Sequence, residues 1–96
     1  MPYLVLEYSV VEDYLQRREE FRDEHLSLAR AAHARGELVL AGALSDPADR
    51  AILVFRDDDP SAPGRFVEQD PYVRSGIVTS WTVRTWNVVV GGEAAS

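Results

Sequence analysis

The fold is decided by the central segment Glu37-Leu38-Val39-Leu40-Ala41-Gly42-Ala43-Leu44-Ser45-Asp46-Pro47-Ala48-Asp49-Arg50-Ala51-Ile52-Leu53-Val54-Phe55-Arg56. Its two apolar runs, residues 37–44 and 51–56, are typical of strands. The residues between them, 45–50, carry the turn formers Ser, Asp and Pro and predict a loop. We therefore expect an antiparallel hairpin in the middle of the chain.

A long helix is predicted before this hairpin, over residues 14–32, with Asp13 as its N-cap and Gly36 as its stop. At about 100° per residue, one narrow stripe of this helix collects five side chains: Tyr14, Phe21, His25, Leu28 and Ala32. The stripe is apolar except for one imidazole, so we expect it to pack on a core with His25 at its centre.

A second, shorter helix is predicted after the hairpin, over residues 61–69. Asp59 is its expected N-cap and Pro60 its first helical residue. Pro63-Gly64 interrupts this helix, and Asp70-Pro71 ends it, because proline disfavours helix in the residue before it.

Strands at both ends complete the chain, over residues 2–9 and 77–89. The order β-α-β-β-α-β predicts an α+β, ferredoxin-like fold, in which a four-stranded antiparallel sheet carries both helices on one face. A chain of 96 residues makes one domain, which we place at residues 1–90, followed by a flexible tail over residues 91–96.

The strands are apolar on both faces, although the helices cover one face only. In the first strand, Tyr3 and Val5 face one side of the sheet while Leu4 and Leu6 face the other. In the third strand, Leu53 and Phe55 face one side while Ile52 and Val54 face the other. A large exposed apolar face usually marks an interface. We therefore expect a homodimer that packs sheet against sheet.

Composition excludes several classes of function. The formal net charge of −6 argues against nucleic acid as a partner, since phosphate contacts require a basic surface. All 10 basic residues are Arg, which excludes a lysine Schiff base, and the absence of Cys excludes thiolate chemistry. With no secretory signal and no apolar run near the ~20 residues of a membrane span, we expect a cytoplasmic protein without a membrane partner.

His25 is the first candidate for chemistry, because a polar group on an apolar helix face needs a partner. Asp70 is the candidate partner. The pair would be either a general acid/base device or a structural hydrogen bond to an Asp that caps a turn, and the residues alone leave both open.

Four further residues are candidates for binding a small-molecule ligand. Arg22 would bind an anionic group or else pair with a surface acid, and Tyr72 would line a pocket or else pack. Gly42 marks a close approach of ligand or else a bulge, and Ser45 offers a hydroxyl at the pocket mouth or else forms a turn. We expect no metal or other cofactor, since His33 lies off the stripe of His25 and should be exposed.

Three segments resemble the YciI-like (YCII-related) domain family: residues 22–26, 36–44 and 70–78. Their order and spacing extend the resemblance over nearly the whole chain. It implies a ferredoxin-like dimer, the dimeric α+β barrel, with an active site built on a His–Asp dyad, here His25 and Asp70. One activity in this family removes chloride from a chlorinated hydroxyquinol. The short loop at residues 45–50 and Pro63-Gly64 depart from the family pattern and leave the substrate open.

The function we expect is that of a small dimeric enzyme that performs cofactor-free acid/base chemistry. Isomerisation, elimination or dehalogenation of a small aromatic or cyclic substrate would suit one His–Asp dyad. The alternative is a non-catalytic ligand-binding or accessory domain of the same fold.

Overall fold

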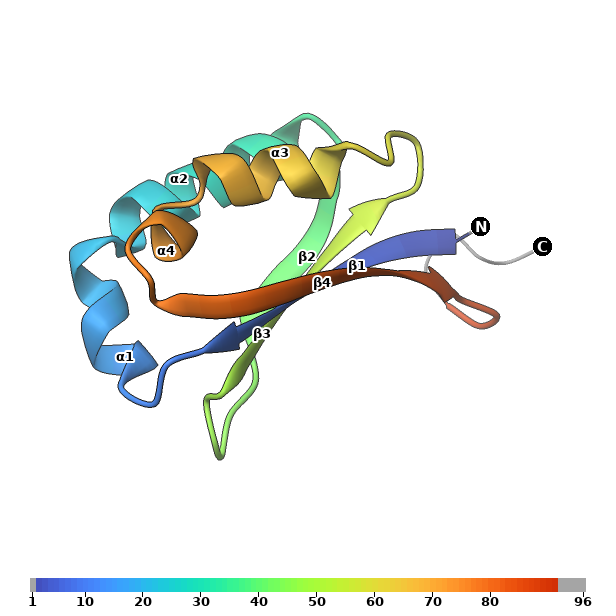
Figure 1. Ribbon diagram of the computed structural model, residues 1–96. Coiled ribbons are helices and arrows are strands. Elements are labelled where there is room, and N and C mark those ends of the chain that lie inside the picture. Colours follow the sequence, from blue (N-terminus) through green and yellow to red (C-terminus); the bar gives the residue numbers. More distant parts are fainter. Residues whose placement is uncertain (1, 92–96) are drawn as a thin grey trace.

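The computed structural model describes residues 2–91 and arranges them as one sheet under a layer of helices (Figure 1). The elements follow in this order: β1 (Pro2–Val10), α1 (Tyr14–Arg17), a 3₁₀ turn η1 (Arg18–Glu20), α2 (Arg22–Ala34), β2 (Leu38–Ala43), β3 (Arg50–Arg56), α3 (Ala62–Gln69), α4 (Pro71–Arg74) and β4 (Val78–Asn87). The predicted β-α-β-β-α-β order is confirmed.

The four strands form a single sheet in the order β2-β3-β1-β4, and all three neighbouring pairs are antiparallel. Leu6 on the central strand β1 lies opposite Leu53 of β3 and Val83 of β4. All the helices lie on one face of the sheet, as Figure 1 shows. The predicted ferredoxin-like α+β fold is therefore confirmed.

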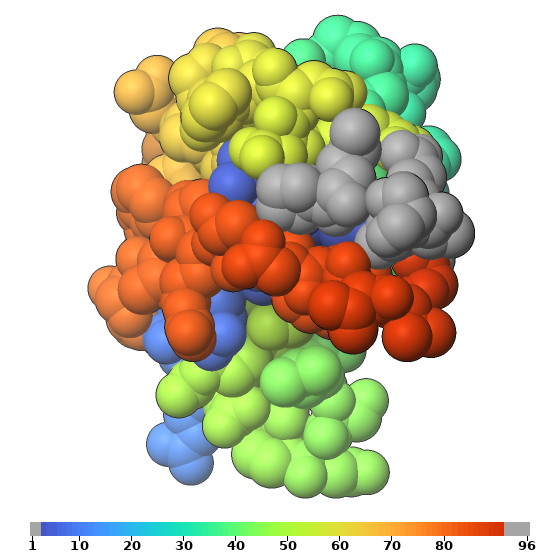
Figure 2. Space-filling model, turned by 90° about the vertical axis from the view of Figure 1, so that its right-hand side faces the viewer, coloured from blue at the N-terminus to red at the C-terminus, as the bar shows by residue number. Residues whose placement is uncertain are grey.

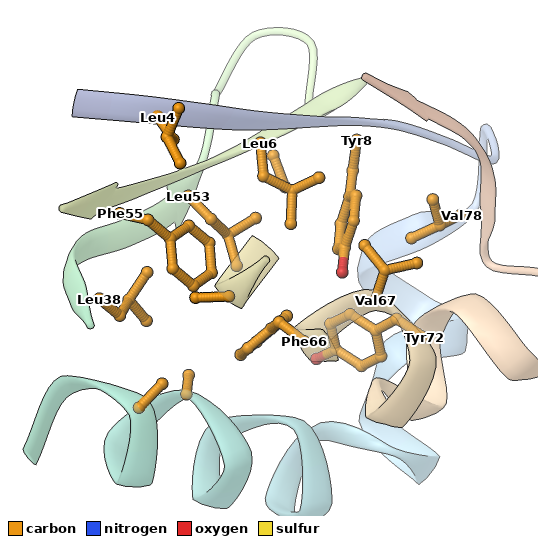
Figure 3. Packing of buried hydrophobic residues seen from close by; sticks show 14 of the residues in the cluster. Leu4, Leu6, Tyr8, Leu38, Leu53, Phe55, Phe66, Val67, Tyr72 and Val78 are labelled. Carbon is orange, nitrogen blue, oxygen red and sulfur yellow. The ribbon is translucent and has the colours of Figure 1, made fainter. Parts of the chain in front are cut away.

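The core lies between the sheet and the helices. Leu4, Leu6 and Tyr8 point inward from β1, and Ala51, Leu53 and Phe55 do so from β3. They pack against Phe66 and Val67 of α3 and Tyr72 of α4 (Figure 3). The strict alternation along both strands is the expected period of a sheet with one face on the core.

The opposite face, which we call the outer face, carries the alternate residues of each strand. Tyr3 and Val54 are buried there, while Leu40 and Trp86 are exposed. Trp81, by contrast, lies opposite Tyr8 and so belongs to the helix side of the edge strand β4. In Figure 2 the orange-red band of β4 runs across the surface, with the green β2–β3 loop projecting below it.

The single helix expected over residues 14–32 is wrong. It is divided into α1, η1 and α2, and the backbone leaves helical geometry at Phe21, with φ −112° and ψ 2°. The bend lets Tyr14 enter the core, where its ring meets the ring of Tyr72 edge-on at 6.0 Å. The contact between α1 and α4 stabilises the bent chain. Helical periodicity cannot predict this contact, because the two elements are far apart in the sequence.

The second helix also differs from the expectation. It begins at Ala62 with Ser61 in the N-cap position, so Asp59 is not the N-cap and Pro60 is not helical. Asp59 Oδ1 instead accepts a hydrogen bond from the Ser61 amide at 3.0 Å. Pro63 does not interrupt the helix, because it lies in the first turn, where a missing N–H costs nothing.

The stop signals at Gly36 and at Asp70-Pro71 are confirmed. Gly36 and Gly76 both have φ +83°, which only glycine adopts readily, and they follow α2 and α4. α3 ends at Gln69, and the short helix α4, which was not predicted, begins at Pro71.

No helix within residues 2–91 is long and apolar enough to cross a bilayer. The cytoplasmic location stays a prediction. The predicted tail lies outside the described residues, apart from Gly91.

Candidate active site

Asp70 is a carboxylate without any solvent exposure, held at the junction of α3 and α4. Because Pro71 follows it, Asp70 is extended, with φ −74° and ψ 119°, and occupies the N-cap position of α4. Its Oδ1 accepts a hydrogen bond from the Tyr72 amide at 3.0 Å. Asp70 therefore caps a turn, as one of the two sequence interpretations required.

The same carboxylate also meets His25. The Nδ1 atom of His25 lies 2.9 Å from Asp70 Oδ1, and Tyr8 donates its hydroxyl proton to Oδ2 at 2.7 Å. Three donors from β1, α2 and α4 thus converge on one buried carboxylate. A buried charge needs hydrogen bonds of this kind to offset its lost hydration. Asp70 therefore has two roles at once: it caps α4 and it bonds His25.

The His25 ring is fixed in orientation by its aromatic neighbours. It stacks on Tyr72 with ring centroids 3.9 Å apart and an interplanar angle of 8°, and Phe66 meets it edge-on at 6.1 Å. An ionised carboxylate only accepts hydrogen bonds, so Nδ1 carries the proton and the neutral imidazole keeps its lone pair on Nε2. The His25 side chain is 14% exposed, which leaves the ring reachable from solvent.

Two phenols near the pair stay protonated at neutral pH. Burial raises the pKa of Tyr8, and the Asp70 charge and its hydrogen bond raise this pKa further. Burial likewise raises the pKa of Tyr72 to about 12, although the positive charges of Arg22 and Arg18 act in the opposite direction. Tyr8 is therefore a permanent donor to Asp70, and Tyr72 carries a neutral hydroxyl.

A cavity of about 200 Å³ opens beside this pair, between the α1–α2 segment and the strands β1 to β3. Its polar lining is Tyr8, Tyr14, Arg18, Arg22, His25 and Tyr72. Its apolar lining is Leu26, Ala29, Ala41, Ala43, Ala51 and Leu53. Because an apolar cavity of about 150 Å³ holds a benzene molecule, this one has room for a single substituted ring.

The predicted ligand-binding residues divide between this cavity and a neighbouring groove. Arg22, Gly42 and Tyr72 line the cavity with His25. Ser45 does not: it is exposed and lines a groove beside the β2–β3 loop, which Arg22 also borders. The structure therefore brings Ser45 near the cavity mouth but not to the His25–Asp70 pair.

Gly42 marks neither a bulge nor a tight contact. The pairing of β2 with β3 is continuous from Ala41 to Ala43, and the irregularity lies between Leu38 and Leu40. A Cβ atom built on Gly42 would meet nothing within 4 Å. The bulge interpretation is wrong, and a side chain at this position would project into open space.

Arg22 makes no ion pair among residues 2–91, and neither does Arg18. The exposed ion pairs of the described chain use other arginines, such as Arg35 with Glu37 and Arg74 with Glu24. The interpretation of Arg22 as one half of a surface ion pair is therefore wrong.

Sequence reasoning missed three polar residues of the site: Tyr8, Tyr14 and Arg18. Tyr8 did carry a signal, because it alternates with Leu4 and Leu6 on the inward face of β1 and a buried phenol needs a partner. Arg18 carried none, since the 3₁₀ turn that directs it was not predicted.

His33 lies in the same helix as His25 but outside the cavity. It is exposed, as predicted, and its Nδ1 lies 2.8 Å from the Leu38 carbonyl oxygen. Within the described residues, no group of three or more His, Asp or Glu side chains is placed to hold a metal ion.

Tyr72→Phe is expected to make the protein more resistant to alkali. The Tyr72 pKa rises from 10.0 in the unfolded chain to about 12 in the fold, so above pH 10 the phenol ionises in the unfolded chain first, and the free energy of unfolding of the wild type falls as the pH rises toward 12. We expect urea unfolding to show that the free energy of unfolding of the variant, relative to that of the wild type, is about 2–3 kcal/mol higher near pH 12 than at pH 8. Parallel pH profiles for the two proteins would contradict the burial of the phenol.

The fold and the buried His–Asp–Tyr cluster define a small ferredoxin-like α+β domain with an open, ring-sized cavity. A family model described as the YCII-related domain matches residues 1–87, and the chain belongs to that family.

A curated relative and a solved structure illustrate what the chain is similar to. The curated relative is the L-cysteine:1D-myo-inositol 2-amino-2-deoxy-alpha-D-glucopyranoside ligase of Kineococcus radiotolerans, 29% identical over 85 residues. The match covers 85% of this chain but only 20% of the ligase, so the chain spans about a fifth of that relative's length. One similar solved structure is a 5-chloro-2-hydroxyhydroquinone dehydrochlorinase from Burkholderia phenoliruptrix, in complex with 2,5-dihydroxybenzoquinone. It has a TM-score of 0.70 and 19% identity, and the match covers 90% of this chain and 93% of that one, which shows a shared fold.

Proposed function

We propose that this protein is a small enzyme that uses His25 and Asp70 for cofactor-free acid/base chemistry on a small aromatic or cyclic substrate. The observation that carries the proposal is the 2.9 Å contact between His25 Nδ1 and the fully buried Asp70, at the wall of a ring-sized cavity. Isomerisation, elimination and dehalogenation all need a proton moved at one atom of the substrate, which a single oriented imidazole performs.

Each residue of the cluster has a distinct task in this proposal. Asp70 holds the imidazole with its Nδ1 proton inward, which leaves Nε2 as the nitrogen that can accept a proton. Nε2 takes a proton from the bound ring, and a departing chloride or the return of that proton to a neighbouring atom completes the step. Tyr8 and the Tyr72 amide keep the Asp70 carboxylate in place. They are positioning groups, since they act through their hydrogen bonds to Asp70.

The structural neighbour supports the choice of reaction class. Its name states a dehydrochlorination of a chlorinated hydroxyhydroquinone, and its structure contains a flat dihydroxyquinone. A cavity of about 200 Å³ suits a molecule of that size.

The test is turnover of two compounds taken from that neighbour. Chloride release from 5-chloro-2-hydroxyhydroquinone measures elimination, and deuterium uptake at the ring carbons of 2,5-dihydroxybenzoquinone in D₂O measures proton transfer alone. We expect the wild type to accelerate at least one of them over the buffer, and His25→Gln to remove the acceleration. Rates equal to the buffer rate for both compounds would favour the alternative function.

That alternative is a non-catalytic ligand-binding or accessory domain, and the ligase relative favours it. The chain matches only a fifth of that ligase, which is what a domain attached to a larger enzyme would show. In this case His25→Gln alters ligand affinity or stability, and there is no turnover to lose.

We also propose that two chains associate through the outer face. The helices leave this face open, and it exposes Leu40 by 61% and Trp86 by 51% beside the buried Tyr3 and Val54. An apolar sheet face of this kind is stabilised by a second copy.

The dimer proposal predicts a mass of twice 10.7 kDa in light scattering at micromolar concentration. Leu40→Asp should lower the mass toward one chain, because it buries a charge in the apolar interface. The matched control is Leu15→Asp, since Leu15 is exposed to a similar extent, 52%, but lies in α1 on the helix side. A wild type that scatters as one chain excludes the dimer.

A further inference from the structure

One end of the cavity holds two arginines that form no ion pair and a phenol hydroxyl that has no hydrogen-bond partner, among the residues that the structure describes. Arg18 in η1 and Arg22 at the start of α2 both line the cavity, and both also border the groove at its mouth. Neither forms an ion pair with a carboxylate among residues 2–91. The groove also holds one carboxylate, Asp46, which forms no ion pair with either arginine in the described chain, so two positive charges stand against one negative charge at the mouth of a cavity on a protein of formal net charge −6.

Arg18 is oriented toward the cavity by Tyr14. Its guanidinium carbon lies 5.1 Å from the centre of the Tyr14 ring, and its Nη1 donates to the Tyr14 hydroxyl at 3.4 Å. The Nε atom is buried and has no acceptor within the described residues. A charged donor left without an acceptor is costly, so its retention indicates an acceptor supplied from outside the chain.

Tyr72 supplies a second and independent sign of a missing acceptor. The residue is 1% exposed, lines the same cavity, and its hydroxyl has no hydrogen-bond partner in the described structure. An unsatisfied buried hydroxyl destabilises a fold. A phenylalanine would pack the ring against His25 equally well, so the hydroxyl itself needs an explanation.

We propose that Arg18, Arg22 and the Tyr72 hydroxyl form an anion subsite, and that the substrate is a single-ring compound with one anionic oxygen. The ring lies against the apolar residues Ala41, Ala43 and Leu53, and the anionic oxygen meets the three donors. Carboxylate and enolate oxygens share this chemistry. The inference rests on the proposed function, because it names the substrate class of the same cavity.

The subsite also accounts for the separate positions of the arginines and the imidazole in the cavity lining. The cations lie toward the groove at the mouth, whereas His25 and Tyr8 line the wall next to Asp70. An anionic group bound by the arginines would hold the rest of the ring toward the imidazole. Binding the substrate by a non-reacting group in this way positions the reacting atom at the base.

The test is equilibrium binding by titration calorimetry at pH 7, with three probes and no turnover. Sodium benzoate carries a carboxylate, 2,5-dihydroxybenzoquinone carries an enolate, and benzamide is the neutral match of benzoate. We expect at least one anion to bind the wild type at least about tenfold more tightly than benzamide, which corresponds to about 1.4 kcal/mol. Benzoate alone would identify a carboxylate subsite, and the quinone alone an enolate subsite.

Substitutions then assign the donors. Arg18→Gln and Arg22→Gln should each weaken the anion about tenfold and leave benzamide unchanged, and Tyr72→Phe should weaken it about threefold. Arg18→Lys keeps the charge and should restore part of the loss. The matched controls are Arg17→Gln and Arg30→Gln, on exposed residues of α1 and α2 outside the cavity. Circular dichroism of each variant checks that the fold is retained.

Two results would overturn the subsite: wild-type protein that binds all three probes equally, or anion affinity that the arginine substitutions leave unchanged. Its failure is distinguishable from that of the proposed function. If turnover depends on His25 while the three probes bind equally, only the subsite is wrong. If the anions bind through the arginines but no compound is turned over, the subsite stands and the catalytic proposal is wrong.

Discussion

Asp70→Ala lowers the free energy of unfolding by about 3–5 kcal/mol, the largest stability effect we expect of a polar substitution in this chain. The substitution leaves three donors, on Tyr8, His25 and the Tyr72 amide, without their shared acceptor. It also removes the cap of α4, which costs about 1 kcal/mol by itself.

Urea unfolding measures this effect, and two further variants make the result specific. Asp58→Ala, in the exposed turn after β3, should change the free energy of unfolding by less than about 0.5 kcal/mol. Asp70→Asn should lie between the extremes, because its carbonyl oxygen still accepts while its amide can donate to the Tyr8 hydroxyl oxygen. A loss below about 1 kcal/mol for Asp70→Ala would contradict the three-donor cluster.

Under the proposed chemistry, His25→Gln lowers the turnover rate by about 10²–10⁴-fold while the protein stays folded. Glutamine keeps an N–H donor for Asp70, so the cluster around that carboxylate can persist. It has no titratable lone pair at the position of Nε2, so the proton transfer fails. The expected signature is therefore a fall in kcat with an almost unchanged midpoint of thermal unfolding.

The control for this variant is His33→Gln, since His33 is an exposed histidine of the same helix outside the cavity. It should retain full turnover. Long-range ¹H–¹⁵N NMR spectra of the wild type should show that the neutral form of the His25 imidazole carries its proton on Nδ1, as the Asp70 contact requires. Retained turnover in His25→Gln, or a proton on Nε2, would remove His25 from the proposed role.

The order of elements and the fold class follow from the sequence by itself. Two apolar runs around a turn predict a hairpin, and Gly36 and the Asp70-Pro71 step predict helix ends within two residues of those in the structure. These signals act within a few residues, through backbone geometry and strand alternation, so a reader of the sequence can use them.

The need for a site at His25 was also visible in the sequence, because an imidazole on an apolar stripe requires a partner. The choice of Asp70 as that partner was an inference across 45 residues, and the geometry of the contact belongs to the fold alone. Tyr8, at 62 residues from Asp70, joins the cluster only because β1 is the central strand beneath α4.

The break at Phe21 was decided only by the tertiary structure. Helical periodicity runs through residues 14–32 without interruption, yet the chain bends there because Tyr14 is more stable against Tyr72 than in solvent. That bend directs Arg18 into the cavity, so the anion subsite depends on it. Local pattern therefore determined which elements form, while long-range burial determined where they bend and which side chains meet, since a contact's free energy is gained only when both partners leave water together.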